Sequence, residues 1–239
     1  MKVFMALIVA TALAPTGAAG QTAIELLEKA DRYRGDFDSA VFRVRLTNYD
    51  GERMSEEADF EVSVEGENSL VKFLSVRSKG QSLLMRGDDM WFFLPAVARP
   101  VRITPIQRLL GNVSNGDLAR LRYAADYDAA IAGTTEVDGV ACTILELTAR
   151  RKGATYQRIR YVLRTSDGRP TRADYFLTSG KAVKSASFGE LKTLAARQIL
   201  TRLDIRDADR PASRTIIDTL GIESRDLPDK IFSPSRAGG

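Results

Sequence analysis

The chain has 239 residues, with 35 lysines and arginines against 31 aspartates and glutamates and a formal net charge of +4. Such a mild excess of positive charge suits a soluble protein and is too small to indicate nucleic-acid binding. The sequence contains no histidine and one cysteine, Cys142. It therefore excludes Ser-His-Asp and Cys-His catalytic systems and an internal disulfide, and it lacks the commonest zinc ligand.

The first 20 residues have the pattern of a cleavable secretory signal. Lys2 supplies a positive charge, residues 3–14 an apolar core, and residues 15–20 the small side chains at which cleavage is expected. No later stretch approaches the roughly 18 continuous apolar residues of a transmembrane helix. We expect an exported protein in which residues 21–232 form a single domain and residues 233–239 a flexible tail.

The elements that follow predict a mainly β (α+β) protein. Residues 22–34 carry apolar side chains at helical spacing before Gly35, which predicts an amphipathic helix. The period then changes to two on both sides of the turn Asp50-Gly51, which predicts a hairpin of residues 42–46 and 58–65. Further strands of a curved antiparallel sheet are predicted at 70–76, 81–86, 90–94, 141–148, 156–164, 171–177, 183–188, 197–205 and 214–219.

Residues 105–130 interrupt this pattern. Ile106, Leu109 and Leu110 indicate one helical turn, and residues 111–116 a polar loop. Residues 117–123 are predicted as a short helix capped by Asn115 or Asp117. An irregular insertion in a β domain often serves as a lid, so we expect one here.

The apolar strand faces either fill a closed core or line a cavity. Core filling is the commoner role of a single apolar residue. A curved sheet, however, must cover its concave face, and this sequence offers only the N-terminal helix and the short insertion for that purpose, so we predict a cavity. Strand alternation and the aromatic run place these residues at the predicted cavity: Phe42, Val44, Phe60, Val62, Met85, Met90, Trp91 and Phe93.

A cavity of this kind suits acyl chains. Burial of a chain of roughly sixteen carbons can contribute on the order of 10 kcal/mol before any head-group contact. Arg99 and Arg102 follow the aromatic run and are candidates for contact with an anionic head group or a partner, although solvated loop arginines are an equally good interpretation. Ser69 and Lys72 match Ser-x-x-Lys, but residues three apart in a strand point to opposite faces, so the pattern carries no catalytic site.

The order of motifs resembles that of the outer-membrane lipoprotein-sorting proteins of the LolA-like superfamily, in a longer branch than classical LolA. The resemblance rests on Arg34-Gly35-Asp36, the Asp50-Gly51 hairpin, residues 89–95 (Asp-Met-Trp-Phe-Phe-Leu-Pro), and the closing residues 226–234. It implies an unclosed antiparallel half-barrel wrapped around the N-terminal helix and a short helical insertion or lid. It further implies a periplasmic chaperone that binds acyl chains of lipids or lipoproteins in a hydrophobic cavity, without cofactor, metal or catalytic step.

Two hypotheses therefore stand beside each other. The first is a carrier that moves acyl chains toward the outer membrane, with an inner-membrane exporter or an outer-membrane acceptor as partner. The second is a lipid-sensing regulatory or adaptor protein of the same fold that binds a membrane partner such as an exporter. A monomer is expected under either hypothesis. An enzyme, such as a lipid hydrolase, ranks third because no residue set has the spacing that such chemistry needs.

Overall fold

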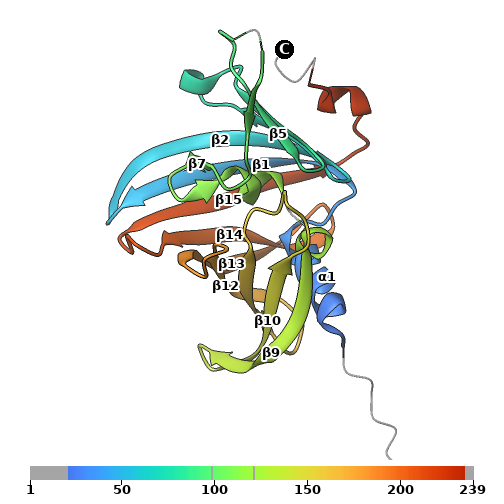
Figure 1. Cartoon of the computed structure of the whole chain (residues 1–239), viewed down its shortest axis with the longest axis vertical. Coiled ribbons are helices and arrows are strands. Elements are labelled where there is room, and N and C mark those ends of the chain that lie inside the picture. Colours follow the sequence, from blue (N-terminus) through green and yellow to red (C-terminus); the bar gives the residue numbers. More distant parts are fainter. Residues whose placement is uncertain (1–20, 98, 121, 235–239) are drawn as a thin grey trace, which may run out of the picture.

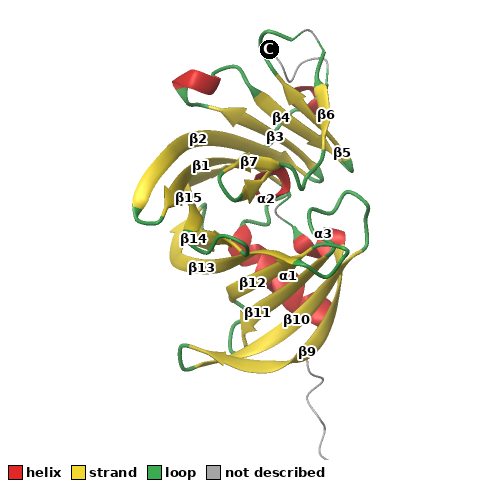
Figure 2. Cartoon of the chain, turned by 60° about the vertical axis from the view of Figure 1, so that its left-hand side comes forward, coloured by secondary structure: helices red, strands yellow, loops and turns green. Residues whose placement is uncertain are grey.

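The computed structural model describes residues 21–97, 99–120 and 122–234. The predicted secretory signal (1–20) and residues 235–239 of the predicted tail lie outside this part of the chain. Within it, a sheet of 13 strands curves around three α-helices (Figures 1 and 2). The protein is therefore mainly β, as the sequence predicts.

All neighbouring strands of the large sheet run antiparallel. From one edge to the middle, the strands are β6 (Val101–Ile103), β5 (Asp89–Phe93), β4 (Ser82–Arg86), β3 (Asn68–Phe73), β2 (Arg53–Glu65) and β1 (Ser39–Asp50). From the middle to the other edge, they are β15 (Ser213–Ser224), β14 (Arg197–Asp207), β13 (Ala182–Leu194), β12 (Pro170–Phe176), β11 (Arg158–Arg164), β10 (Val140–Ala149) and β9 (Tyr127–Val137).

Two meanders make up this sheet, and they join where the first strand, β1, pairs with the last, β15. The edge strands β6 and β9 lie at opposite ends of the strand order, so the sheet does not close into a barrel. The helices lie inside its curve (Figure 2). The predicted open half-barrel wrapped around helices is confirmed.

Helix α1 (Ala23–Arg34) has clear start and stop signals. Thr22 and Glu25 form a capping box at its start, and Gly35 ends it in the left-handed conformation, at φ 96°. A Cβ on residue 35 would also lie 2.7 Å from the Phe42 ring, so glycine is required twice over. The helix packs against β14, β9 and α3 on the concave face. No helix in the described part of the chain is long and apolar enough to cross a membrane.

The insertion after β6 differs in detail from the prediction. The helical turn expected around Ile106, Leu109 and Leu110 is wrong, because β7 (Arg108–Leu110) pairs with β8 (Val113–Ser114) in a separate small hairpin. The short helix begins earlier than expected, as α2 (Asn115–Ala119) capped by Ser114, and α3 (Tyr123–Asp126) follows it. The 3-10 turns η1 (Val76–Ser78) and η2 (Asp229–Phe232) complete the elements.

The sequence did not reveal strand β9. It is an edge strand, and most of its residues are exposed on both faces. No row of buried side chains therefore imposes an apolar period of two on residues 127–137, and the usual sign of a strand is missing.

Candidate ligand cavity on the concave face

Apolar side chains form a row across the concave face from β1 to β5. Phe42 lies opposite Val62, and Val62 opposite Val71. The row continues through Leu83 to Phe92. Directly opposite residues share one face of a sheet, and all five pack in or against the main core cluster.

A second apolar row reaches β1 from the other meander. Phe188 on β13 lies opposite Leu203 on β14, and Leu203 lies opposite Ile217 on β15. Ile217 in turn lies opposite Leu46 on β1. The concave face is therefore apolar from β13 through the central strands to β5.

A cavity of about 60 Å³ lies where these rows meet α1 and α2. A dry apolar cavity of roughly 150 Å³ is needed to hold one benzene molecule, so this closed form has no room for an acyl chain. Binding one requires its cover to move. The lining residues are Arg34, Phe42, Val44, Val62, Asp117, Leu118, Phe188, Leu200, Thr201, Leu203, Ile217 and Thr219.

Arg34, in the last turn of α1, brings a cation to this cavity. Its side chain is 8% exposed, 3.6 Å from the carboxylate of Asp31, and its guanidinium lies 3.7 Å from the centre of the Tyr123 ring. A guanidinium stays protonated in proteins and presents several donors in one plane. The cavity wall therefore combines an apolar surface with the cation of Arg34 and the carboxylate of Asp117.

Asp31 joins α1 to α3. Its carboxylate accepts a 2.8 Å hydrogen bond from the backbone N–H of Ala124. Burial raises the pKa of the Asp31 carboxyl to about 6, against the opposing effects of Arg34 and the backbone N–H groups. Asp31 thus titrates within the range of pH in which the protein can be studied.

Helix α2, which covers the cavity, is held by a buried ion pair. Asp117 on α2 and Lys184 on β13 lie 2.5 Å apart, with side chains 7% and 5% exposed. Asp117 also accepts a 2.8 Å hydrogen bond from the Tyr156 hydroxyl, and Lys184 donates to the Asn112 carbonyl at 2.9 Å. Burial lowers the pKa of the Lys184 ammonium. These contacts fix the cover to the wall of the half-barrel.

Tyrosines fill the concave face beyond β13. Tyr156, Tyr161 and Tyr175 are fully buried, and the hydroxyl groups of Tyr123 and Tyr175 lie 3.1 Å apart. Burial raises the pKa of each of these phenols. Because these side chains occupy the interior of β10–β13, the space for a ligand lies toward β13–β15, β1 and β2.

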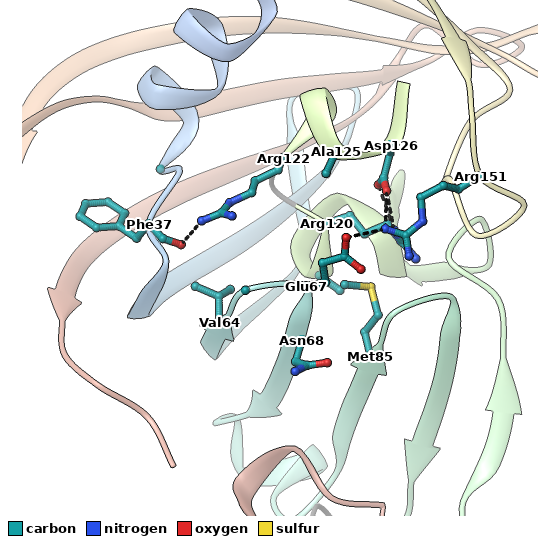
Figure 3. Close-up of a pocket in the computed structure, with 13 residues that line it drawn as sticks. Phe37, Val64, Glu67, Asn68, Met85, Arg120, Arg122, Ala125, Asp126 and Arg151 are labelled. Carbon is teal, nitrogen blue, oxygen red and sulfur yellow. Dashed lines mark hydrogen bonds and ion pairs between the residues drawn. The ribbon is translucent and has the colours of Figure 1, made fainter. Parts of the chain in front are cut away.

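A second, smaller hollow has a volume of about 40 Å³. Its wall contains five charged side chains beside apolar ones (Figure 3). Arg120 donates to Asp126 at 2.8 Å, and Arg151 lies 2.9 Å from Glu67 in an ion pair. Arg122 donates to the Phe37 carbonyl at 2.8 Å. Arg122 thereby joins the insertion to the α1–β1 loop, and Arg151 joins the β10–β11 loop to the β2–β3 turn, so these guanidinium groups hold the wall of the hollow together.

Comparison with known structures identifies the family. The sequence is 31% identical to the LolA superfamily protein of Nitrosomonas europaea, with a TM-score of 0.85, over 90% of this chain and 98% of that one. The chain belongs to the LolA superfamily. A family model described as an uncharacterized protein matches residues 65–236. No curated protein matches the sequence.

Two further structures share the fold of this LolA superfamily protein. A DUF1329 family protein from Desulfovibrio piger has a TM-score of 0.73 at 24% identity, over 88% of this chain and 95% of that one. A putative outer membrane lipoprotein-sorting protein domain from Vibrio parahaemolyticus has a TM-score of 0.75 at 15% identity, over 91% of this chain and 98% of that one.

The concave face of this LolA superfamily protein carries six of the predicted cavity residues. Phe42, Val44 and Val62 line the 60 Å³ cavity itself. The other three belong to the same core cluster without lining that cavity: Phe60, Met85 and Met90. Met85 lines the second, smaller hollow instead (Figure 3).

Trp91 and Phe93 were predicted at the same cavity, and this is wrong. Both pack in a separate apolar cluster with Phe232 of η2, whereas their neighbours Met90 and Phe92 face the main core. Successive side chains of a strand point to opposite faces, so one aromatic run cannot lie wholly inside. The C-terminal segment covers this outer face (Figure 1).

The two predicted head-group arginines lie away from the cavity. Arg102 lies opposite Trp91, forms an ion pair with Asp89, and keeps 72% of its side chain exposed. Arg99 is exposed in the β5–β6 loop. Neither lines the cavity, so a role in recognition there is not supported by their position.

Sequence reasoning missed the charged residues of the cavity wall, Arg34 and Asp117, and also Lys184, the ion-pair partner of Asp117. Arg34 could have been found, because Leu27, Asp31 and Arg34 share one helical face, which puts a charged pair on the apolar side of α1. Asp117 and Lys184 are 67 residues apart in the sequence and belong to no local pattern.

Proposed function

We propose that this protein is a periplasmic carrier that binds acyl chains of lipids or lipoproteins on its concave face and moves them toward the outer membrane. The observation that carries the proposal is the apolar face running from β13 to β5 inside an unclosed sheet. The description of the Vibrio parahaemolyticus relative as a putative outer membrane lipoprotein-sorting protein domain supports the same class of cargo.

Loading requires that α2 leave its place. Leu118 of α2 lies in the wall of the cavity, so moving the helix would enlarge the cavity and expose the apolar row to a ligand. The acyl chain would then replace Leu118 as the cover of Val44, Val62 and Ile217. Each buried methylene contributes about 0.8 kcal/mol, which supplies the driving force.

Arg34 would orient the cargo. Its guanidinium lies in an otherwise mainly apolar wall and can donate hydrogen bonds to ester or phosphate oxygens near the head of a lipid. No bond to the cargo is made or broken in this proposal, so the protein acts as a binding protein and not as an enzyme.

The first test is native mass spectrometry with lipid extraction, applied to the mature protein purified gently from the periplasm of its source. Near-stoichiometric lipid or acylated peptide is expected and would identify the cargo class. A protein that is always empty and does not bind added lipids would contradict the carrier hypothesis and would favour the adaptor hypothesis. The small volume of the closed cavity is the observation that favours the adaptor.

A cavity-filling variant makes the test specific. Leu203→Trp places a large side chain in the cavity wall, where Leu203 is half-buried, and should abolish lipid loading. Leu220→Trp is the matched control, because Leu220 is 53% exposed on the neighbouring strand β15. Equal loading of both variants, each with a normal thermal unfolding transition, would place the lipid elsewhere.

A further inference from the structure

Two loops meet at one end of strands β3–β6, which we call the wing. The β3–β4 loop leaves β3 after Phe73, and the β5–β6 loop leaves β5 after Phe93. Ser82 at the start of β4 lies opposite Phe93, so both loops emerge from the same end of the sheet. We call residues 74–81, 94–97 and 99–101 the tip, and Figures 1 and 2 show it at the far end of the wing.

The two loops touch. A Cβ built on Gly80 of the first loop would lie 2.9 Å from the Pro95 side chain of the second. The tip is therefore one surface feature and not two unrelated turns.

The tip exposes apolar side chains. Leu74, Val97 and Val101 are 46–49% exposed, and Val76 is 91% exposed. These are four of the twelve large apolar side chains exposed in the described part of the chain, although the tip has only 15 described residues. Exposed apolar side chains that gather in this way mark an interaction site.

The charge of the tip has one sign. It contains Arg77, Lys79 and Arg99, all exposed, and no aspartate or glutamate. With 31 acidic residues in 239, a set of 15 residues would be expected to hold about two. An apolar tip with a purely cationic rim fits a surface that is apolar inside and anionic outside.

We propose that the tip docks this protein on an anionic lipid surface. Val76, Leu74 and Val97 would enter the boundary between head groups and acyl chains, while the three cations pair with lipid phosphates. A protein partner fits less well, because the 15 described residues of the tip are fewer than the roughly 20–30 residues that each partner contributes to a usual interface.

Docking at the tip would place the cargo route against the membrane. An open hollow of about 520 Å³ lies between the wing and the insertion. Phe73, Phe92 and Ile103 line it together with the polar side chains of Gln81, Gln107, Arg108 and Asn115. Phe92 is also the end of the apolar row that leads to the cavity through Leu83 and Val71. Docking at the tip would therefore help a carrier to exchange its cargo with the membrane. The docking proposal itself does not depend on what the cavity binds.

The test is sedimentation of the full mature chain with vesicles. Binding is expected to vesicles of phosphatidylethanolamine and phosphatidylglycerol, and to fall with added salt. The variant Arg77→Gln/Lys79→Gln/Arg99→Gln should bind on the order of 100-fold more weakly, since each cation near such a surface is worth about fivefold. The matched control, with the same loss of charge elsewhere, is Arg32→Gln/Lys152→Gln/Arg160→Gln.

A second pair of variants tests the apolar part. Val76→Asp should abolish binding, whereas Ile131→Asp should not, because Ile131 is 52% exposed on β9 at the opposite edge of the sheet. The cavity-filled Leu203→Trp protein should still bind vesicles, which separates docking from cargo loading.

Three results would overturn the proposal. Equal losses in the tip and control cation variants would show that only net charge matters. Equal binding to phosphatidylcholine vesicles would remove the role of anionic lipid. A concentration-dependent dimer that Val76→Asp abolishes, without vesicle binding by the unmodified chain, would assign the tip to a second copy of the protein.

Discussion

Replacing Lys184 tests how α2 is held over the cavity. In Lys184→Met the apolar side chain has a similar length, but the buried carboxylate of Asp117 loses its counter-charge at 2.5 Å. Breaking one side of a buried ion pair costs about 3–5 kcal/mol. Asp117 keeps the Tyr156 hydroxyl and the Ser114 N–H as donors, so we expect a loss near 3 kcal/mol in the free energy of unfolding.

The partner variant Asp117→Asn should cost less. Burial lowers the pKa of Lys184 already, so without Asp117 the amine can lose its proton and remain buried in the neutral form. The double variant should cost less than the sum of the two single variants, because no isolated charge remains. Urea unfolding, followed by circular dichroism at neutral pH, measures all four corners of this cycle.

Binding of a fluorescent fatty acid then shows whether α2 is the cover. Lys184→Met should take up the probe faster, and hydrogen exchange should increase in residues 112–119. A loss of less than about 1 kcal/mol in Lys184→Met, or strictly additive costs in the cycle, would refute the reasoning on the ion pair. Unchanged uptake with increased exchange would show that α2 loosens without covering the ligand.

Three further predictions concern other contacts. The pKa of Asp31 is raised from 3.8 to about 6 in the folded state, so the unmodified protein should lose about 3 kcal/mol of stability as pH rises from about 4 to 6. Asp31→Asn has no carboxyl group to titrate and should not show this loss. Equal pH dependence of the urea midpoints of both proteins would contradict this prediction. Phe232→Ala should free the C-terminal segment, cost about 3 kcal/mol and shift the emission of Trp91 to the red, whereas an unchanged spectrum would mean that the segment stays in place. Gly116→Ala should cost about 1–3 kcal/mol, because its Cβ would lie 1.9 Å from the Thr155 hydroxyl, and Thr155→Ala should restore part of the loss in thermal unfolding.

The strands with one buried face were predictable. In β2 and β14, burial of one face forces the apolar period of two that the sequence shows, and glycines at positive φ such as Gly35 mark an element end. The edge strand β9 was not predictable, since its exposed faces impose no pattern. The β7–β8 hairpin was missed for a related reason. Its strands have three and two residues, which is too short for an alternation of apolar and polar side chains to be recognised.

The cavity was predictable only in part. Alternation identified Phe42, Val44 and Val62 correctly as residues of the concave face. It would also have placed Trp91 outside, had the pleat been given more weight than the aromatic run. The apolar cover of Trp91 comes from residues 226–234, which lie more than 130 positions away in the sequence, and no local pattern indicates that they return to cover β3–β5.

The closed cavity itself implies a preference for long acyl chains. Opening carries Asp117 away with α2, and a charge that stays buried at Lys184 without its partner costs about 3–5 kcal/mol, while each methylene that enters contributes about 0.8 kcal/mol. Burial of about four to six methylenes therefore only offsets the free-energy cost of opening the cavity. Further methylenes must be buried to offset the entropy that is lost on binding. A short chain cannot hold the cavity open, whereas a chain of sixteen carbons can. Because Lys184→Met removes the opening cost, it should bind shorter chains than the unmodified protein does, and an unchanged dependence of affinity on chain length would show that the ion pair does not set this preference.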